Sequence, residues 1–236
     1  MKLKEDILNV FFPPRCPVCD GVMQLESDIC PDCRKKVTTI KEPACKKCGK
    51  QLENERTEFC SDCRKKKHYF SQGKAVFVYE GGIRQSMYRF KYSNKREYAS
   101  FYAKEAVKNY GAWIKRKDIE VIIPVPMYYW KERERGYNQA AVFARKLGKL
   151  CDIPAQCHMV KRTRNTTPQK ELNELERKAN LKKAFQLVSN IVEYKKILLV
   201  DDIYTTGSTI DAVAEVLLSA GAEEVYFLCI SIGDGY

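Results

Sequence analysis

Apolar and polar positions follow two distinct patterns along most of the chain. Four short apolar runs, rich in β-branched and aromatic residues, have the pattern of buried strands, and they span 75–79, 121–123, 197–200 and 225–232. Four longer stretches place apolar side chains at helical spacing, and they span 81–90, 98–110, 139–150 and 209–220. Because strands and helices alternate, the pattern predicts an α/β fold in which a parallel sheet is flanked by helices.

The first 63 residues follow a different pattern, which is set by cysteine. Eight cysteines form four CxxC pairs, namely Cys16/Cys19, Cys30/Cys33, Cys45/Cys48 and Cys60/Cys63. Two residues between cysteines let both thiolates of a tight turn face one ion, and zinc takes four such ligands. We expect tandem zinc ribbons with one structural zinc ion in each consecutive quartet, because metal binding supplies folding free energy where apolar residues are few.

Two alternatives for these cysteines stay open at this stage. The sequence does not specify which pairs join, so interleaved ligation is the first alternative. A dithiol redox role is the second, although four pairs in two matched units exceed what a dithiol switch uses.

The chain length suits a zinc module followed by one α/β domain, since 236 residues exceed the needs of a single small domain. Apolar density is low and the chain turns basic between Arg64 and Lys67. We therefore expect a cysteine-rich unit at 1–68 and an α/β domain at 69–236.

An excess of positive charge indicates an anionic partner. Lysine and arginine number 42 against 30 aspartate and glutamate, and the net charge of +12 favours phosphate esters or nucleic acid over neutral ligands. No segment approaches the ~20 apolar residues that a membrane span needs. Glu5 and Asp6 lie where a secretory signal carries only positive charge. These features predict a cytoplasmic location without membrane insertion.

The strongest chemical signal follows the apolar run at 197–200. Two carboxylates, Asp201 and Asp202, come next, and the small polar segment 205–209 then leads into an amphipathic helix. Hydroxyl groups, a glycine that permits close backbone approach, and the unpaired amides of a helix start together form a cradle for an anion. The alternative is a polar strand end followed by an ordinary helix cap, but caps seldom need five consecutive small residues.

The thirteen residues 197–209 resemble the phosphoribosyl pyrophosphate signature of type I phosphoribosyltransferases. The resemblance implies that fold, and it implies that the catalytic pair Asp201 and Asp202 holds the ribose hydroxyls. It assigns the 5′-phosphate to Thr205, Thr206, Gly207, Ser208 and Thr209. The pyrophosphate, accompanied by Mg²⁺, is expected at the loop after an earlier strand, at Val125, Pro126 and Met127.

Two further segments narrow the resemblance to the ComF family of competence proteins. They are 135–139 (Arg-Gly-Tyr-Asn-Gln) taken with 90–92 (Phe-Lys-Tyr), and the stretch 162–180. The chain departs from that family in Met127-Tyr128, where relatives commonly carry Leu-His, in Tyr137 for Phe, and in two cysteine quartets where some relatives carry one. These departures concern details of the pyrophosphate loop more than the fold.

The segment 162–177 is polar and suits a mobile loop that closes over bound phosphates. Arg162 and Arg164 would supply planar donors for those phosphates. A surface loop without function is the alternative. Lys91 could reach a phosphate as well, or it could be a solvated lysine on a helix.

Three functions remain open. The ComF resemblance implies a role in DNA uptake during natural competence, with single-stranded DNA handled in the cytoplasm beside a competence helicase. Tyr128, Tyr129 and Trp130 would suit base stacking, although such aromatic residues are more often part of a core. A metabolic phosphoribosyltransferase acting on a base or an amine is the second possibility, and a non-catalytic sensor of phosphoribosyl pyrophosphate is the third. No acceptor motif is recognisable, so neither acceptor nor turnover is predicted.

Overall fold

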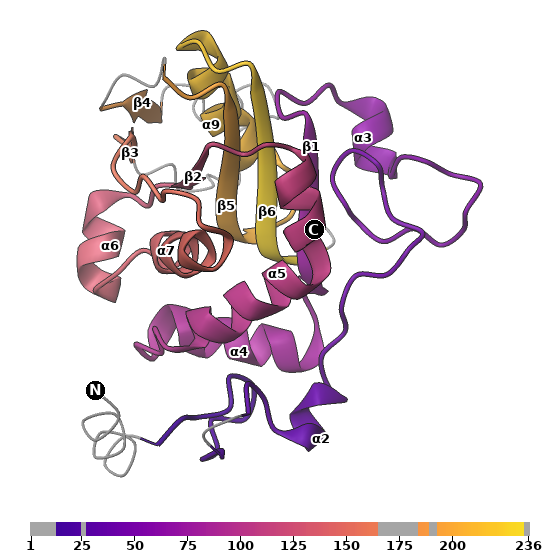
Figure 1. Ribbon diagram of the computed structural model, residues 1–236, viewed down its shortest axis with the longest axis vertical. Coiled ribbons are helices and arrows are strands. Elements are labelled where there is room, and N and C mark those ends of the chain that lie inside the picture. Colours follow the sequence, from indigo (N-terminus) through magenta and orange to yellow (C-terminus); the bar gives the residue numbers. More distant parts are fainter. Residues whose placement is uncertain (1–12, 25–26, 165–183, 189–192, 234–236) are drawn as a thin grey trace, which may run out of the picture.

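Four parallel strands form the central sheet of the computed structural model, which describes residues 13–24, 27–164, 184–188 and 193–233 (Figure 1). The strand order is β1-β6-β5-β2, and the strands span Gln72–Val78 (β1), Val121–Pro124 (β2), Lys196–Tyr204 (β5) and Glu224–Ile232 (β6). Every pairing in this sheet is parallel. The predicted parallel sheet flanked by helices is confirmed.

Side chains of β5 alternate between two apolar cores. Leu198 and Val200 lie in one cluster, while Ile197 and Leu199 lie in the other. The first cluster is covered by α4 (Gly81–Tyr92), α5 (Tyr98–Arg116) and α7 (Gln139–Cys151), and the second by α9 (Ser208–Ser219). A sheet buried on both faces explains why its strands read as continuous apolar runs.

The two cysteine quartets belong to different cores. Cys16 and Cys33 pack in the cluster under α4 and α5, and Cys45 and Cys48 pack in the cluster that contains α9. One short helix begins within the second CxxC of each quartet, α2 (Pro31–Arg34) in the first and α3 (Ser61–Lys65) in the second, and Figure 1 shows them at separate places on the domain. The division at residue 68 stays a prediction, because each quartet shares a core with the sheet.

The segment between the quartets covers the outer edge of β1. Thr39 pairs antiparallel with Phe77, and the Ile40 amide donates to the Val76 carbonyl at 3.0 Å. This pairing protects an edge strand that would otherwise expose unpaired backbone groups.

Some elements differ from the sequence prediction. Strand β5 continues four residues beyond the predicted end at Val200, because β6 provides a partner as far as the Tyr204–Ile232 pair. Helix α6 (Tyr129–Arg135) and the antiparallel hairpin of β3 (Val160–Arg162) and β4 (Phe185–Leu187) were not predicted. Helix α6 buries no residue, so it has no apolar stripe to reveal it.

Most of the predicted phosphate-covering loop, from 165 to 177, lies outside the described residues. In the part of the chain that the structure describes, no helix has the length and apolar character needed to cross a membrane.

Candidate functional site

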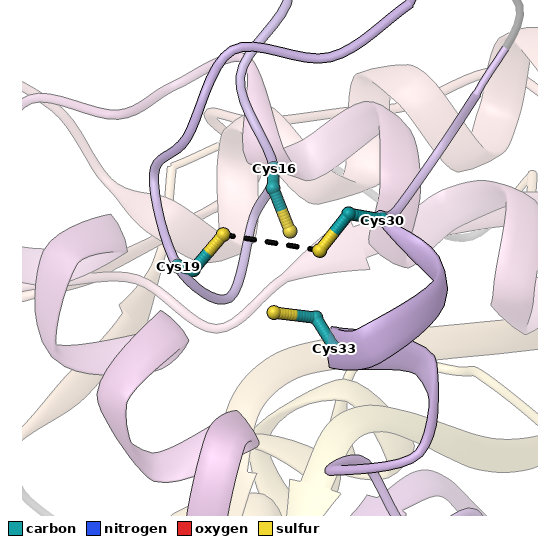
Figure 2. A group of neighbouring side chains, drawn as sticks. All are labelled: Cys16, Cys19, Cys30 and Cys33. Carbon is teal, nitrogen blue, oxygen red and sulfur yellow. Dashed lines mark hydrogen bonds between the residues drawn. The ribbon is translucent and has the colours of Figure 1, made fainter.

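The sulfur atoms of the first quartet converge on a common centre (Figure 2). In this quartet and in the second, the four ligand atoms lie within 4.8 Å of one another, and the groups are Cys16, Cys19, Cys30, Cys33 and Cys45, Cys48, Cys60, Cys63. The sulfurs of Cys19 and Cys30 are 3.9 Å apart, and those of Cys48 and Cys60 are 3.7 Å apart. Zinc–sulfur bonds of about 2.3 Å in a tetrahedron require sulfur separations of about 3.8 Å. The geometry therefore fits a zinc ion in each consecutive quartet.

The two ribbons repeat one local design. The first CxxC of each is a tight turn in which an amide four residues on donates to the first cysteine carbonyl, from Asp20 to Cys16 at 2.9 Å and from Gly49 to Cys45 at 2.8 Å. Both turns place that residue at positive φ, 62° for Asp20 and 77° for Gly49. Asparagine, aspartate and glycine tolerate this conformation best, which explains the residue choice.

The acid pair lies near the carboxyl end of β5. Lys91, from the last turn of α4, places Nζ 2.9 Å from Asp202 Oδ2, and its side chain is only 19% exposed. Burial lowers the pKa of Lys91, but the Asp202 carboxylate outweighs that effect and the pKa is raised. Lys91 is therefore an ion-pair partner of the acid pair and not a solvated helix lysine.

Asp201 ionises less readily than an ordinary aspartate. Burial, followed by the neighbouring charge of Asp202, raises the pKa of Asp201 to about 8. Its Oδ1 accepts a hydrogen bond from the Asp202 amide at 2.8 Å. The site thus holds one carboxyl that is mainly protonated at neutral pH beside one carboxylate that is paired with a lysine.

The segment after β5 turns sharply into α9. Gly207 takes a φ of +78°, and a Cβ at this position would lie 2.5 Å from the Tyr204 hydroxyl oxygen. Thr206 Oγ1 and Ser208 Oγ are 3.1 Å apart, and Thr205 and Thr206 are exposed. We call residues 205–209 the phosphate loop, because hydroxyl groups and the first amides of a twelve-residue helix meet there.

Tyr204 packs against this loop, with its hydroxyl group next to Gly207. Its ring is buried and stacks on Phe227, with the ring centroids 4.7 Å apart. Burial raises the pKa of Tyr204 well above its ordinary value. The hydroxyl is thus a neutral group between the second quartet and the phosphate loop.

The loop after β2 lies beside the acid pair because β2 and β5 are neighbours. The Val125 amide donates to the Val200 carbonyl at 2.9 Å, and Asn138 Nδ2 donates to the Val125 carbonyl at 3.0 Å. Val125 and Pro126 are buried, and Met127 is half-buried. The structure therefore brings this predicted pyrophosphate loop to the same sheet edge as the acids.

The two predicted arginines differ in position. Burial lowers the pKa of Arg162, and the charge that Asp201 carries when it is ionised opposes that shift. The Arg162 guanidinium also lies over the Phe185 ring, 5.4 Å from its centroid. Arg164 is exposed, and the described contacts do not include one between it and the acid pair.

The segment 135–139 connects the walls of the site. Tyr137 and Gln139 both donate from their side chains to the Phe90 carbonyl near the end of α4. Asn138 caps α7 by accepting from the Ala140 amide at 2.9 Å while it holds the loop after β2. This motif therefore positions α4, and with it Lys91.

Tyr128, one of the three aromatic residues considered for base stacking, is half-buried. The other two, Tyr129 and Trp130, belong to a group of four largely exposed aromatic side chains on α4 and α6, with exposed fractions of 64%, 63%, 62% and 59% for Tyr88, Tyr92, Tyr129 and Trp130. Arg135 lies 5.0 Å from the Tyr92 ring centroid and Arg133 lies 5.7 Å from that of Trp130. We call these four exposed aromatic residues and two arginines the aromatic–arginine surface. A depression of about 760 Å³ follows α4 beside it and is lined in part by Lys91.

Two family models match the chain. The double zinc ribbon domain matches residues 7–64, and the phosphoribosyl transferase domain matches residues 134–232. The fold and the cysteine quartets thus define a protein with a phosphoribosyltransferase domain preceded by a double zinc ribbon.

Several known proteins are similar to this chain over most of its length. Competence protein F of Haemophilus influenzae is 32% identical over 223 residues, which cover 91% of this chain and 95% of that protein. DNA utilization protein YhgH of Escherichia coli K12 is 27% identical over 91% of this chain and 88% of its own length. Competence protein ComFC of Bacillus subtilis is 26% identical over 85% and 82%, respectively. The chain belongs to the competence protein F family.

Metal analysis tests the grouping of the cysteines. We expect about two zinc ions per chain in the wild-type protein, because each quartet offers four thiolates. The double change Cys19→Ser with Cys30→Ser should leave one ion, since both residues belong to one quartet. The pair Cys19→Ser with Cys60→Ser should leave none. With interleaved ligation, Cys19 and Cys30 would belong to different sites, so the first double change would leave no zinc. A wild-type protein without zinc would contradict the assignment altogether.

The thermal stability of an Asp201→Asn variant tests the raised pKa. The unfolded carboxyl titrates near 3.8 and the folded one near 8, so its stabilising contribution is present below pH 4 and is lost as the pH rises to about 8. Asparagine cannot ionise, so the variant should exceed the wild-type Tm by a margin that grows from pH 4 to 8 and then levels off. At about 2–4 °C per kcal/mol, the margin should reach several degrees.

The exposed change Glu53→Gln serves as the control for this titration and should show no such margin. A difference between Asp201→Asn and wild type that stays constant from pH 4 to 8 would contradict the raised pKa.

Proposed function

We propose that this protein binds phosphoribosyl pyrophosphate and acts in DNA uptake during natural competence, where it handles incoming single-stranded DNA in the cytoplasm beside a competence helicase. One observation supports this choice of ligand: the acid pair, the phosphate loop and the loop after β2 meet at one sheet edge. The names of the relatives, competence protein F and DNA utilization protein, support the biological role.

In this proposal each group has one task. Asp201 and Asp202 hold the ribose hydroxyls, and Thr205, Thr206, Gly207, Ser208 and Thr209 hold the 5′-phosphate through hydroxyls and helix amides. Val125, Pro126 and Met127 border the pyrophosphate, with Arg162 and Arg164 as additional donors. Mg²⁺ would arrive with the pyrophosphate and offset its charge, and the carboxylate oxygens nearby are ligands of the kind that it prefers.

Binding does not by itself establish transfer of phosphoribose. A metabolic phosphoribosyltransferase would release pyrophosphate when its acceptor base or amine is added, and a sensor would bind without release. The hydrogen bonds of the loop and acids would serve either role. Incubation with a panel of nucleobases and amines therefore separates these alternatives from binding alone.

Calorimetry with Mg²⁺ and phosphoribosyl pyrophosphate tests the ligand. The double change Asp201→Asn with Asp202→Asn should weaken binding by about 10- to 100-fold, because a hydrogen bond to a charged group, here the Asp202 carboxylate, contributes ~1.5–3 kcal/mol. The exposed change Glu53→Gln should bind like the wild type. The same double change should fail to restore transformation in a deletion strain. No binding by the zinc-replete wild type at millimolar ligand would overturn the proposal.

The aromatic–arginine surface supports the DNA part of the proposal. Exposed rings offer stacking platforms for unpaired bases, and arginines attract the backbone. The Arg135–Tyr92 contact joins α6 to α4, so the surface is continuous across both helices. Its position beside Lys91 places it next to the proposed ligand site.

Fluorescence anisotropy with a labelled oligothymidine tests this surface. Trp130→Ala and Tyr92→Ala should each weaken binding about 5- to 100-fold, since stacking contributes ~1–3 kcal/mol per base. The affinity should also fall steeply with salt. Leu150→Ala, an exposed apolar position on α7, is the matched control and should bind like the wild type. Salt-independent affinity, or no change in either aromatic variant, would contradict the proposed surface.

A further inference from the structure

The segment that leaves the second ribbon contacts the first turn of α9 directly. His68, five residues after the ligand Cys63, has a fully buried side chain whose Nδ1 lies 2.7 Å from Asp211 Oδ2. The next amide, from Tyr69, donates to Asp211 Oδ1 at 3.0 Å. Both carboxylate oxygens of Asp211 are therefore held by the segment that leaves the second quartet.

Asp211 connects this segment to the phosphate loop. Its amide donates to the Gly207 carbonyl at 2.8 Å, which is the first hydrogen bond of the helix after the loop. An acid in the first turn favours a helix but repels a phosphate bound at the same end. Two contacts from the ribbon side compensate the carboxylate, so the loop can accept an anion beside it.

An aromatic stack makes a second connection. Phe70 is fully buried, stacks on His68 at 4.6 Å and meets Tyr204 edge-on at 6.3 Å between ring centroids. Tyr204 in turn lies under Gly207, where no Cβ would fit. A rigid packed core transmits small displacements, because it has few voids to absorb them.

The second quartet is held in place by contacts of its own. Lys47, between two ligands of the second quartet, holds its ammonium 5.3 Å from the Phe70 ring centroid. Its carbonyl accepts a hydrogen bond from the Gly73 amide of β1 at 2.7 Å. Three cysteines of the quartet lie in the same apolar cluster as Tyr204 and Ile210, namely Cys45, Cys48 and Cys60.

The first ribbon docks elsewhere and provides an internal comparison. Asp20 accepts from the Tyr98 hydroxyl at 2.6 Å and pairs with Lys95 at 2.8 Å. Lys104 of α5 pairs with Asp28. The hydrogen bonds and ion pairs described for this ribbon join it to α4, α5 and the turn between them, and none joins it to α9 or the phosphate loop.

We propose that the second ribbon is a positioning element of the phosphate loop, so that zinc at the second quartet and a phosphate at residues 205–209 stabilise each other through the His68–Asp211 and Phe70–Tyr204 contacts. The inference rests on the proposed ligand site. Coupling between two binding sites is reciprocal, so the phosphate must tighten zinc binding by the same factor by which zinc tightens phosphate binding.

Site-resolved cysteine alkylation tests the coupling. Zinc-replete full-length protein is challenged with a chelator and an alkylating reagent, and mass spectrometry follows each cysteine. Phosphoribosyl pyrophosphate with Mg²⁺ should slow alkylation of the second quartet roughly 5-fold or more, the lower end of typical coupling. The alkylation rate of the first quartet should change much less. Ribose 5-phosphate, which lacks the metal-chelating pyrophosphate, should act in the same direction.

His68→Phe isolates the polar link, because it retains the stack on Phe70 and removes the contact with Asp211. We expect two zinc ions to remain, ribose 5-phosphate affinity to fall about 3- to 10-fold, as loss of one hydrogen bond implies, and selective protection to disappear. If His68→Phe loses zinc, Asp211→Asn takes its place and should abolish the selective protection; phosphate affinity is not the readout for that variant, because the change also removes a carboxylate that repels the phosphate. Lys104→Gln, which breaks an ion pair of the first ribbon, should leave affinity and protection unchanged.

The outcomes separate the two proposals. Wild-type protein that binds neither ligand overturns the proposed function, and with it the coupling. Wild-type protein that binds ligand but shows equal protection of both quartets, or none, overturns the coupling alone. Unchanged protection in both His68→Phe and Asp211→Asn also overturns it.

Discussion

The pairing of β5 between β2 and β6 is the constraint on which the rest of the structure depends. It buries the apolar half of β5 on both faces and brings the carboxyl ends of two strands to one edge. The acids therefore lie just beyond the last β2–β5 pair and are partly buried, and burial together with the neighbouring Asp202 charge raises the pKa of Asp201 to about 8. A carboxyl held in such a place costs stability, and such costs are typical of binding sites rather than of structural positions.

One zinc ribbon packs into the core on each side of this sheet. Their segments carry too few apolar residues to fold alone, and each contributes cysteines to a core that it shares with the sheet and the helices. The linker along β1 joins them and closes the sheet edge. The N-terminal region is consequently part of the framework around the site, because one ribbon holds the α4 side and the other holds the α9 side.

Local patterns in the sequence predicted much of this architecture. The apolar runs gave the four strands, and the CxxC spacing gave quartets whose sulfurs do converge. The full length of β5 was missed because strand formation at Asp201 and Asp202 depends on β6, a partner that polar side chains do not reveal. Helix α6 was missed because exposed aromatic and charged residues lack an apolar stripe. The role of Lys91 required the fold, since only tertiary packing brings it to Asp202.

The Lys91–Asp202 pair also restricts what the site can accept. Separating a largely buried ion pair leaves two uncompensated charges, so a ligand must provide partners for both. A sugar diol can donate hydrogen bonds to the carboxylate, and a pyrophosphate can take the lysine. Neither ribose nor inorganic phosphate alone offers both. Under the proposed function, this requirement favours an activated pentose phosphate over its separate parts, and it makes the last turn of α4, which also carries Tyr92, the element that responds when the ligand binds.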